Sequence, residues 1–193
     1  MKTRRASATC SHPMDQPVTQ DRPMMLRLTA AGLLAALCFS AAAPAQDAGE
    51  PVFQGAHSDW RVFTRGEGQG KICYVLSTPV EALPRSADHG DVFFLVASWA
   101  NGDAVEQPSF MAGYALRPES PPLARVGSDR FAMFASEREG FIEEPRDEDR
   151  LVDAMRRGAT MRVEAMSERG TATVYEFSLS GVTAALRQAD QLC

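Results

Sequence analysis

The strongest secondary-structure signal in the chain is TMRVEAMS at residues 160–167, followed by ERG at 168–170 and TATVYEFS at 171–178. Apolar and polar side chains alternate in both longer segments, as Met161 and Val163 do in the first. Such alternation places one set of side chains on each face of a strand. Two segments of this kind joined by a short, glycine-containing turn are typical of a β-hairpin. The C-terminal part of the chain is therefore predicted to be antiparallel sheet.

Shorter segments with the same character precede this hairpin. Residues 59–64 and 72–77 predict a second hairpin. Residues 91–99 form the most apolar run after the leader, and their content of Val and Phe favours a central, buried strand over a helix. Further strands are predicted at 109–116, 123–126 and 130–135, with 79–90 as a connector.

Two helices are predicted among the strands. Residues 147–158 begin with acidic side chains and end with Arg156, Arg157 and a glycine, which matches the helix macrodipole and its usual stop signal. The second helix begins near Gly181 and places an apolar stripe on one face. The expected fold class is all-β, a mostly antiparallel sandwich or barrel-like domain with two short helices.

The N-terminus has the pattern of a secretory signal. An apolar run at residues 28–43 follows Arg22 and Arg27 and ends in the small residues Ala43-Pro44-Ala45. A membrane anchor is the alternative, but this run of about 16 residues is shorter than the roughly 20 that cross a bilayer. A signal peptide at 24–45, cleaved after Ala45, is therefore predicted.

The remaining boundaries follow from this signal. Residues 1–23 are polar and are expected to be disordered or to be an extension of the gene model. Residues 46–57 are expected to form a flexible lead-in, and residues 58–193 a single β-rich domain.

Removing residues 1–45 leaves 15 basic and 23 acidic side chains, a net charge of −8. A domain this acidic lacks the basic surface that nucleic acid or anionic lipid requires, and no stable membrane span is expected after cleavage.

Two of the four cysteines, Cys73 and Cys193, lie outside the leader. In an oxidising compartment such a pair predicts one disulfide, which would close a loop across most of the domain. Two free buried thiols are the alternative.

The sequence contains no catalytic, cofactor-binding or metal-binding signature. The glycines before Lys71 have neither Walker nor dinucleotide-loop spacing, and a flexible turn is the simpler interpretation. His57 and His89 each lie beside a turn, and Asp88 next to His89 is badly placed for a triad because adjacent side chains in extended backbone alternate faces. The acidic residues within 137–149 alternate with arginines, which favours a solvated rim over a calcium site.

Several short motifs, in order, resemble one known family. They are Asp59-Trp60, Cys73 with Ser77-Thr-Pro79, Ser109-Phe110, Gly113-Tyr114, Phe131-x-Met-Phe134, residues 154–159, Ser167-x-Arg-Gly-Thr171, residues 178–186 and the terminal Cys193. Together they resemble the invasion-associated locus B proteins over residues 58–193. The sequence departs from that pattern at Phe141-Ile142, where an aromatic segment is expected, and at Val182, where Phe is usual.

The resemblance implies an exported β-sandwich-like protein of alphaproteobacterial type, periplasmic or associated with the outer membrane and cell surface. The family is named for a link to host-cell invasion, and the resemblance implies no enzyme activity and no cofactor. The expected function is non-enzymatic binding of another macromolecule, an unknown envelope or host protein. The alternative is a periplasmic hydrolase or small-ligand carrier with a site assembled from distant strands, which a pocket holding His57 or His89 near a carboxylate and an exposed serine would favour.

Overall fold

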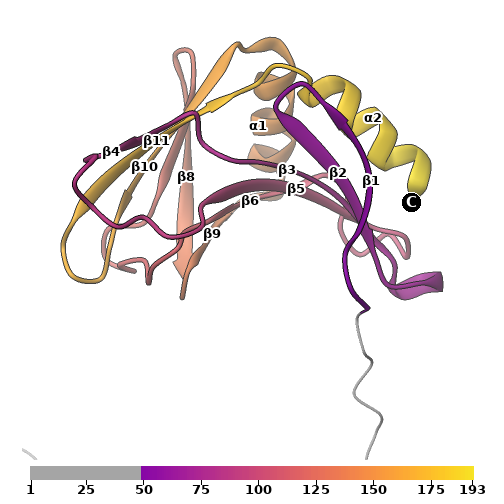
Figure 1. Ribbon diagram of the computed structural model, residues 1–193, viewed down its shortest axis with the longest axis horizontal. Helices are drawn as coiled ribbons and strands as arrows, with labels where there is room; N and C mark the ends of the chain where they lie inside the picture. The colour runs from indigo at the N-terminus through magenta and orange to yellow at the C-terminus, as the bar shows by residue number, and fades with distance from the viewer. Residues whose placement is uncertain (1–48) are drawn as a thin grey trace, which may run out of the picture. The chain divides into compact units, whose positions relative to one another are not determined.

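The computed structural model describes residues 49–193 (Figure 1). The predicted extension at 1–23 and the predicted signal peptide at 24–45 lie outside the described residues. None of the helices within 49–193 is long and apolar enough to cross a membrane.

The described chain is built mainly of strands, all paired antiparallel with their neighbours. The strands are β1 (Val52–His57), β2 (Trp60–Arg65), β3 (Ile72–Ser77), β4 (Glu81–Leu83), β5 (Phe93–Trp99), β6 (Gln107–Met111), β7 (Leu123–Val126), β8 (Asp129–Ser136), β9 (Glu139–Ile142), β10 (Thr160–Met166) and β11 (Ala172–Ser178). Two α-helices, α1 (Pro145–Arg157) and α2 (Val182–Leu192), and a 3-10 turn at Gly68–Gly70 complete the elements. The predicted fold class is confirmed.

The eleven strands form one open sheet in the order β1-β2-β3-β5-β6-β9-β8-β7-β10-β11-β4. This sheet folds over at β8, whose first half pairs with β7 (Val126 opposite Asp129) and whose second half pairs with β9 (Ser136 opposite Glu139). A strand that changes partners in this way makes the corner between two packed layers. We call the layer from β1 to β9 with the second half of β8 sheet A. The layer from the first half of β8 through β7, β10 and β11 to β4 is sheet B (Figure 1).

The core lies between the inner faces of the two sheets. Phe94 and Phe110 of sheet A contact Phe177 and Tyr175 of sheet B, with ring centroids 5.8 and 5.5 Å apart. All four side chains are fully buried. Because each layer supplies the aromatic contacts of the other, neither layer can bury its inner face alone.

Helix α2 packs its apolar stripe on sheet A, as its sequence predicts. The buried side chains are Val182, Ala185, Leu186 and Ala189, and they lie over β2 and β3. The helix ends beside β3, where the sulfurs of Cys193 and the buried Cys73 lie 2.09 Å apart, at disulfide distance. The two cysteines that the sequence pairs are thus neighbours in space.

The expected flexible lead-in was wrong for residues 52–57, which form the edge strand β1. The bulge between Phe53 and Gly55 breaks the alternation that would have marked a strand. Val52 and Phe53 are also more than half exposed, so the segment lacks a buried apolar signature.

The strand predicted at 109–116 begins and ends earlier, at Gln107–Met111. After Met111 the backbone passes close to a neighbouring loop: a Cβ atom on Gly113 would lie 2.1 Å from the carbonyl oxygen of His89. The chain here packs against that loop instead of extending the strand. The predicted connector 79–90 also contains a strand, β4, which pairs with β11.

Candidate functional site

The outer faces of the two sheets differ in chemistry. Every strand of sheet B carries at least one charged side chain on its outer face. Arg125 on β7 lies 3.4 Å from Glu164 on the neighbouring strand β10, and Arg162, on the same strand as Glu164, lies 3.2 Å from that carboxyl group. Charged side chains of this kind keep a sheet face in water. The outer face of sheet B is therefore a solvated surface.

The three central strands of sheet A, β3, β5 and β6, carry no charged side chain on their outer face. The outer-facing residues surround a hollow of about 510 Å³, which we call the outer groove. Its apolar lining is Ile72, Tyr74, Leu76, Phe93, Leu95, Ala97, Trp99, Met111 and Phe141, and its other lining residues are Arg65, Gln107, Ser109 and Glu139. The alternation of β5 explains this composition, because Phe94 and Val96 face the core while Phe93 and Leu95 face the groove.

Aromatic side chains continue the apolar surface to the edge of sheet A. Phe53, Phe63 and Tyr74 are neighbours on β1, β2 and β3, with successive ring centroids 5.5 Å apart. The rings of Phe63 and Tyr74 are stacked. Partial burial raises the pKa of Tyr74, against the opposing effect of Arg65, so the phenol stays neutral. Together with the groove lining, these rings make an apolar surface that reaches from β9 to β1 and is interrupted on β6 by the polar Gln107 and Ser109.

The two ends of the outer groove carry opposite charges. Arg61 and Arg65 project from β2 at one end, where the Nε atom of Arg65 donates a hydrogen bond to the carbonyl oxygen of Gly49 at 3.0 Å. Glu139 on β9 lies at the other end. The groove is thus an apolar floor between a basic and an acidic margin.

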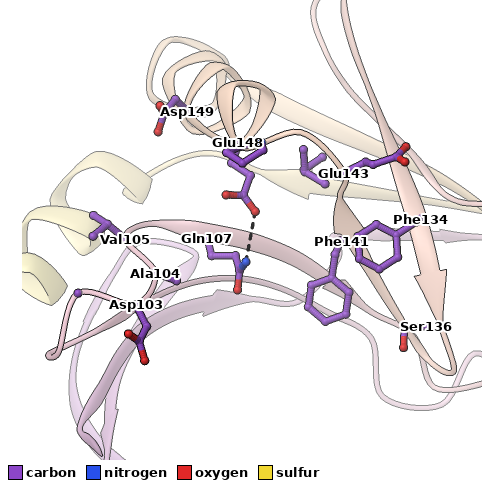
Figure 2. Close-up of a pocket in the computed structure, with 13 residues that line it drawn as sticks. Asp103, Ala104, Val105, Gln107, Phe134, Ser136, Phe141, Glu143, Glu148 and Asp149 are labelled. Atoms are coloured by element: carbon purple, nitrogen blue, oxygen red, sulfur yellow. Dashed lines mark hydrogen bonds between the residues drawn. The ribbon is translucent and has the colours of Figure 1, made fainter. Parts of the chain in front are cut away.

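A second hollow of about 650 Å³ continues the groove at its acidic end, where β9 leaves the sheet and leads into α1 (Figure 2). We call it the acidic-end cavity. Its walls combine the paired rings of Phe134 and Phe141, 5.6 Å apart, with the carboxylates of Asp103, Glu143, Glu148 and Asp149. Gln107 and Phe141 line both hollows, so the two are contiguous.

Glu148 lies on the wall of the acidic-end cavity that belongs to α1. Burial raises the pKa of its carboxyl group, the hydrogen bond from the Nε2 atom of Gln107 (3.3 Å) lowers it, and Asp149 raises it further (Figure 2). Among residues 49–193, no three His, Cys, Asp or Glu side chains are grouped closely enough to hold a metal ion. The cavity is therefore an acidic, aromatic-walled recess without a metal-ligand geometry.

Replacing Glu148 with Gln is expected to flatten the pH dependence of stability above the ordinary glutamate pKa of 4.5. Because the pKa is raised in the folded protein, the folded state binds more protons than the unfolded state in this window, and the free energy of unfolding falls as pH rises. The variant loses the contribution of residue 148 to this slope. Glu106, whose pKa burial also raises, still contributes to it. Urea unfolding at a series of pH values measures the slope, and an unchanged slope would contradict the expectation.

The histidines considered for catalysis have structural partners. The ring nitrogens of His89 lie 2.8 Å from the hydroxyl oxygen of Tyr175 and 3.1 Å from the carbonyl oxygen of Pro84. His57 lies 2.7 Å from Oε1 of Gln188. His89 shares a hollow of about 200 Å³ with Asp91, but no serine lines it. This hollow therefore does not combine the histidine and carboxylate with the serine of a hydrolase triad.

The other candidate segments also have structural roles. The glycine-rich turn before Lys71 leads into β3, and the Nζ atom of Lys71 donates a hydrogen bond to the carbonyl oxygen of Leu192 at 2.5 Å. The acidic segment 137–149 is largely exposed, and Asp147 pairs with Arg150 at 2.6 Å. Sequence reasoning interpreted this segment as a rim and did not detect the cavity that part of it lines.

The fold and surface together define an open, all-antiparallel β-protein with one charged outer face and one apolar, grooved outer face. Comparisons with family models, with curated proteins and with solved structures found no match.

Proposed function

We propose that this chain is an exported, non-enzymatic cell-envelope protein of the invasion-associated locus B type, periplasmic or surface-associated, which binds another protein through the outer groove. The observation that carries the proposal is the contrast between the two outer faces. Three adjacent strands of sheet A present only uncharged residues outward, whereas each strand of sheet B presents charge. The disulfide distance between Cys73 and Cys193 supports an oxidising compartment.

The physical basis is the cost of leaving apolar surface in water. Contiguous exposed apolar patches are uncommon on monomeric proteins and mark interaction sites when charged residues border them. Covering such a patch stabilises a complex by about 25 cal/mol for each Å² of apolar surface removed from water. Partly exposed aromatic side chains such as Tyr74 and Trp99 are the residue types enriched at the centres of protein interfaces.

Leu95→Glu is expected to abolish partner binding while leaving the fold intact, because it places a charge in the middle of the groove floor and removes no core contact. Val174→Glu is the matched control, since residue 174 is likewise partly exposed and lies on the outer face of sheet B. Cross-linking in intact envelopes, with mass-spectrometric identification of the captured protein, measures binding. Val174→Glu should retain the wild-type adduct, and Leu95→Glu should lose it. Equal adduct yields from both variants would refute the proposal.

A further inference from the structure

We infer that the partner segment that fills the outer groove is an amphipathic α-helix, which lies across the strands with its N-terminus at the acidic end. This inference rests on the proposed function, because it specifies the occupant of the same surface. Backbone pairing, groove shape and charge distribution each support it.

The pairing of the floor strands excludes strand addition inside the groove. β3 pairs with β2 and β5, β5 pairs with β3 and β6, and β6 pairs with β5 and β9. Their backbone groups are therefore engaged on both sides, and a partner can contact only their side chains. A partner segment that satisfies its own backbone hydrogen bonds internally, as a helix does, meets this condition without leaving polar groups unpaired.

The shape of the groove suits a cylinder laid across the strands. Figure 1 shows β3, β5 and β6 bowed toward the helices of the domain, so their outer face is hollowed along the strand direction. From β2 to β9 the groove crosses four inter-strand spacings of about 4.8 Å, or roughly 19 Å. A helix of about 13 residues covers this length, and the width of a helix with its side chains is about 10 Å.

The charges at the two margins set the direction of the helix. The N-terminus of a helix carries partial positive charge and the C-terminus partial negative charge. Glu139 and the acidic-end cavity complement the N-terminus, and Arg61 and Arg65 complement the C-terminus. The opposite direction would place the positive N-terminus beside the arginines and the negative C-terminus beside the carboxylates.

The acidic-end cavity adds a preference for one residue type in the partner. A lysine or arginine in the first turn of the bound helix can reach the carboxylates of Glu143 and Glu148 and approach the rings of Phe134 and Phe141. Such a cation gains both ion pairing and cation–π attraction. The inferred partner segment is therefore an amphipathic helix with an apolar stripe and a basic residue near its start.

Trp99 makes the inference testable, because it lines the groove whereas Trp60, the other tryptophan of the domain, is fully buried in the core. The probe is a side-chain-stapled peptide of about 14 residues, with leucines at i, i+3, i+4 and i+7 and one lysine in the first turn. One control peptide has the same composition in an alternating, strand-like order. A second keeps the leucine stripe and moves the lysine to the last turn.

The helical probe should shift the fluorescence of Trp99 to the blue and bind at least about tenfold more tightly than either control peptide. Trp99→Phe should remove the signal, and Leu95→Glu should remove binding. The double variant Arg61→Glu, Arg65→Glu should abolish the preference for lysine in the first turn. An alternating peptide that binds as well as the helical one, or no shift with the helical probe, would overturn the helix inference. The proposed function is decided separately by capture in envelopes with Leu95→Glu, which requires no helix.

Discussion

Replacing Cys73 and Cys193 together with alanine is expected to lower the free energy of unfolding by about 4 to 5 kcal/mol. The disulfide would close a loop between residues 120 positions apart, and a cross-link of that span removes much of the conformational freedom of the unfolded chain. It also fixes the end of α2 to β3, one of the two strands on which this helix packs its apolar stripe. Chemical unfolding followed by circular dichroism measures the change.

The two single variants provide the control. If the stabilisation comes from the bond, Cys193→Ala, which removes an exposed side chain, should cost nearly as much as the double replacement. Adding a reductant should lower the unfolding midpoint of the wild type and leave that of the double variant unchanged. Equal midpoints for wild-type protein with and without reductant, together with alkylation of both thiols, would show that the bond is absent.

Phe94→Ala is expected to lower the free energy of unfolding by about 3 to 5 kcal/mol. Phe94 is fully buried on the inner face of β5, and its ring centroid lies 5.8 Å from that of Phe177 on the opposite sheet. Truncation removes the transfer free energy of the ring and leaves a cavity between two sheets that depend on each other for burial. Denaturant unfolding curves of the wild type and the variant measure this effect.

Phe134→Ala is the matched control for this truncation. It removes the same side chain from an outer face, where Phe134 is 44% exposed and its ring neighbour is Phe141. The expected loss is about 0.5 kcal/mol, as for most surface positions. A loss for Phe94→Ala no larger than that of the control would contradict the placement of the core between sheets A and B.

The hairpin of β10 and β11 was predictable because its signal is local. Alternation in each segment and the short turn between them fix the register, and Thr160 lies opposite Ser178 as a tight hairpin requires. The apolar stripe of α2 was predictable for the same reason, since the helical repeat is contained within a few turns. In both cases the residues that form the pattern are the residues that form the element.

The outer groove was not predictable from the apolar run at 91–99. The prediction of a central, buried strand is confirmed for the inner face, whereas the outer-facing Phe93 and Leu95 are only partly buried and line the groove. A strand covered on both faces and a strand with an apolar interaction face have the same sequence pattern. Only the arrangement of the neighbouring strands shows which face remains uncovered within the described chain.

The acidic-end cavity and the corner at β8 depend on contacts distant in sequence. The cavity forms where the loop at 102–105, the end of β9 and the start of α1 converge. No local motif marks that convergence, and the acidic residues of 137–149 have the composition of an ordinary solvated surface. Likewise, alternation identifies most of β8 as a strand but does not reveal that its two halves pair in different sheets.

A photoreactive side chain at position 95 tests directly whether the apolar outer face of sheet A binds a partner protein. When it replaces Leu95, irradiation of intact envelopes should yield a covalent adduct with a second protein; the same group in place of Val174, on the charged outer face, should yield none. Adducts formed only from position 174, or with equal yield from both positions, would contradict the assignment of the apolar face of sheet A as the binding surface.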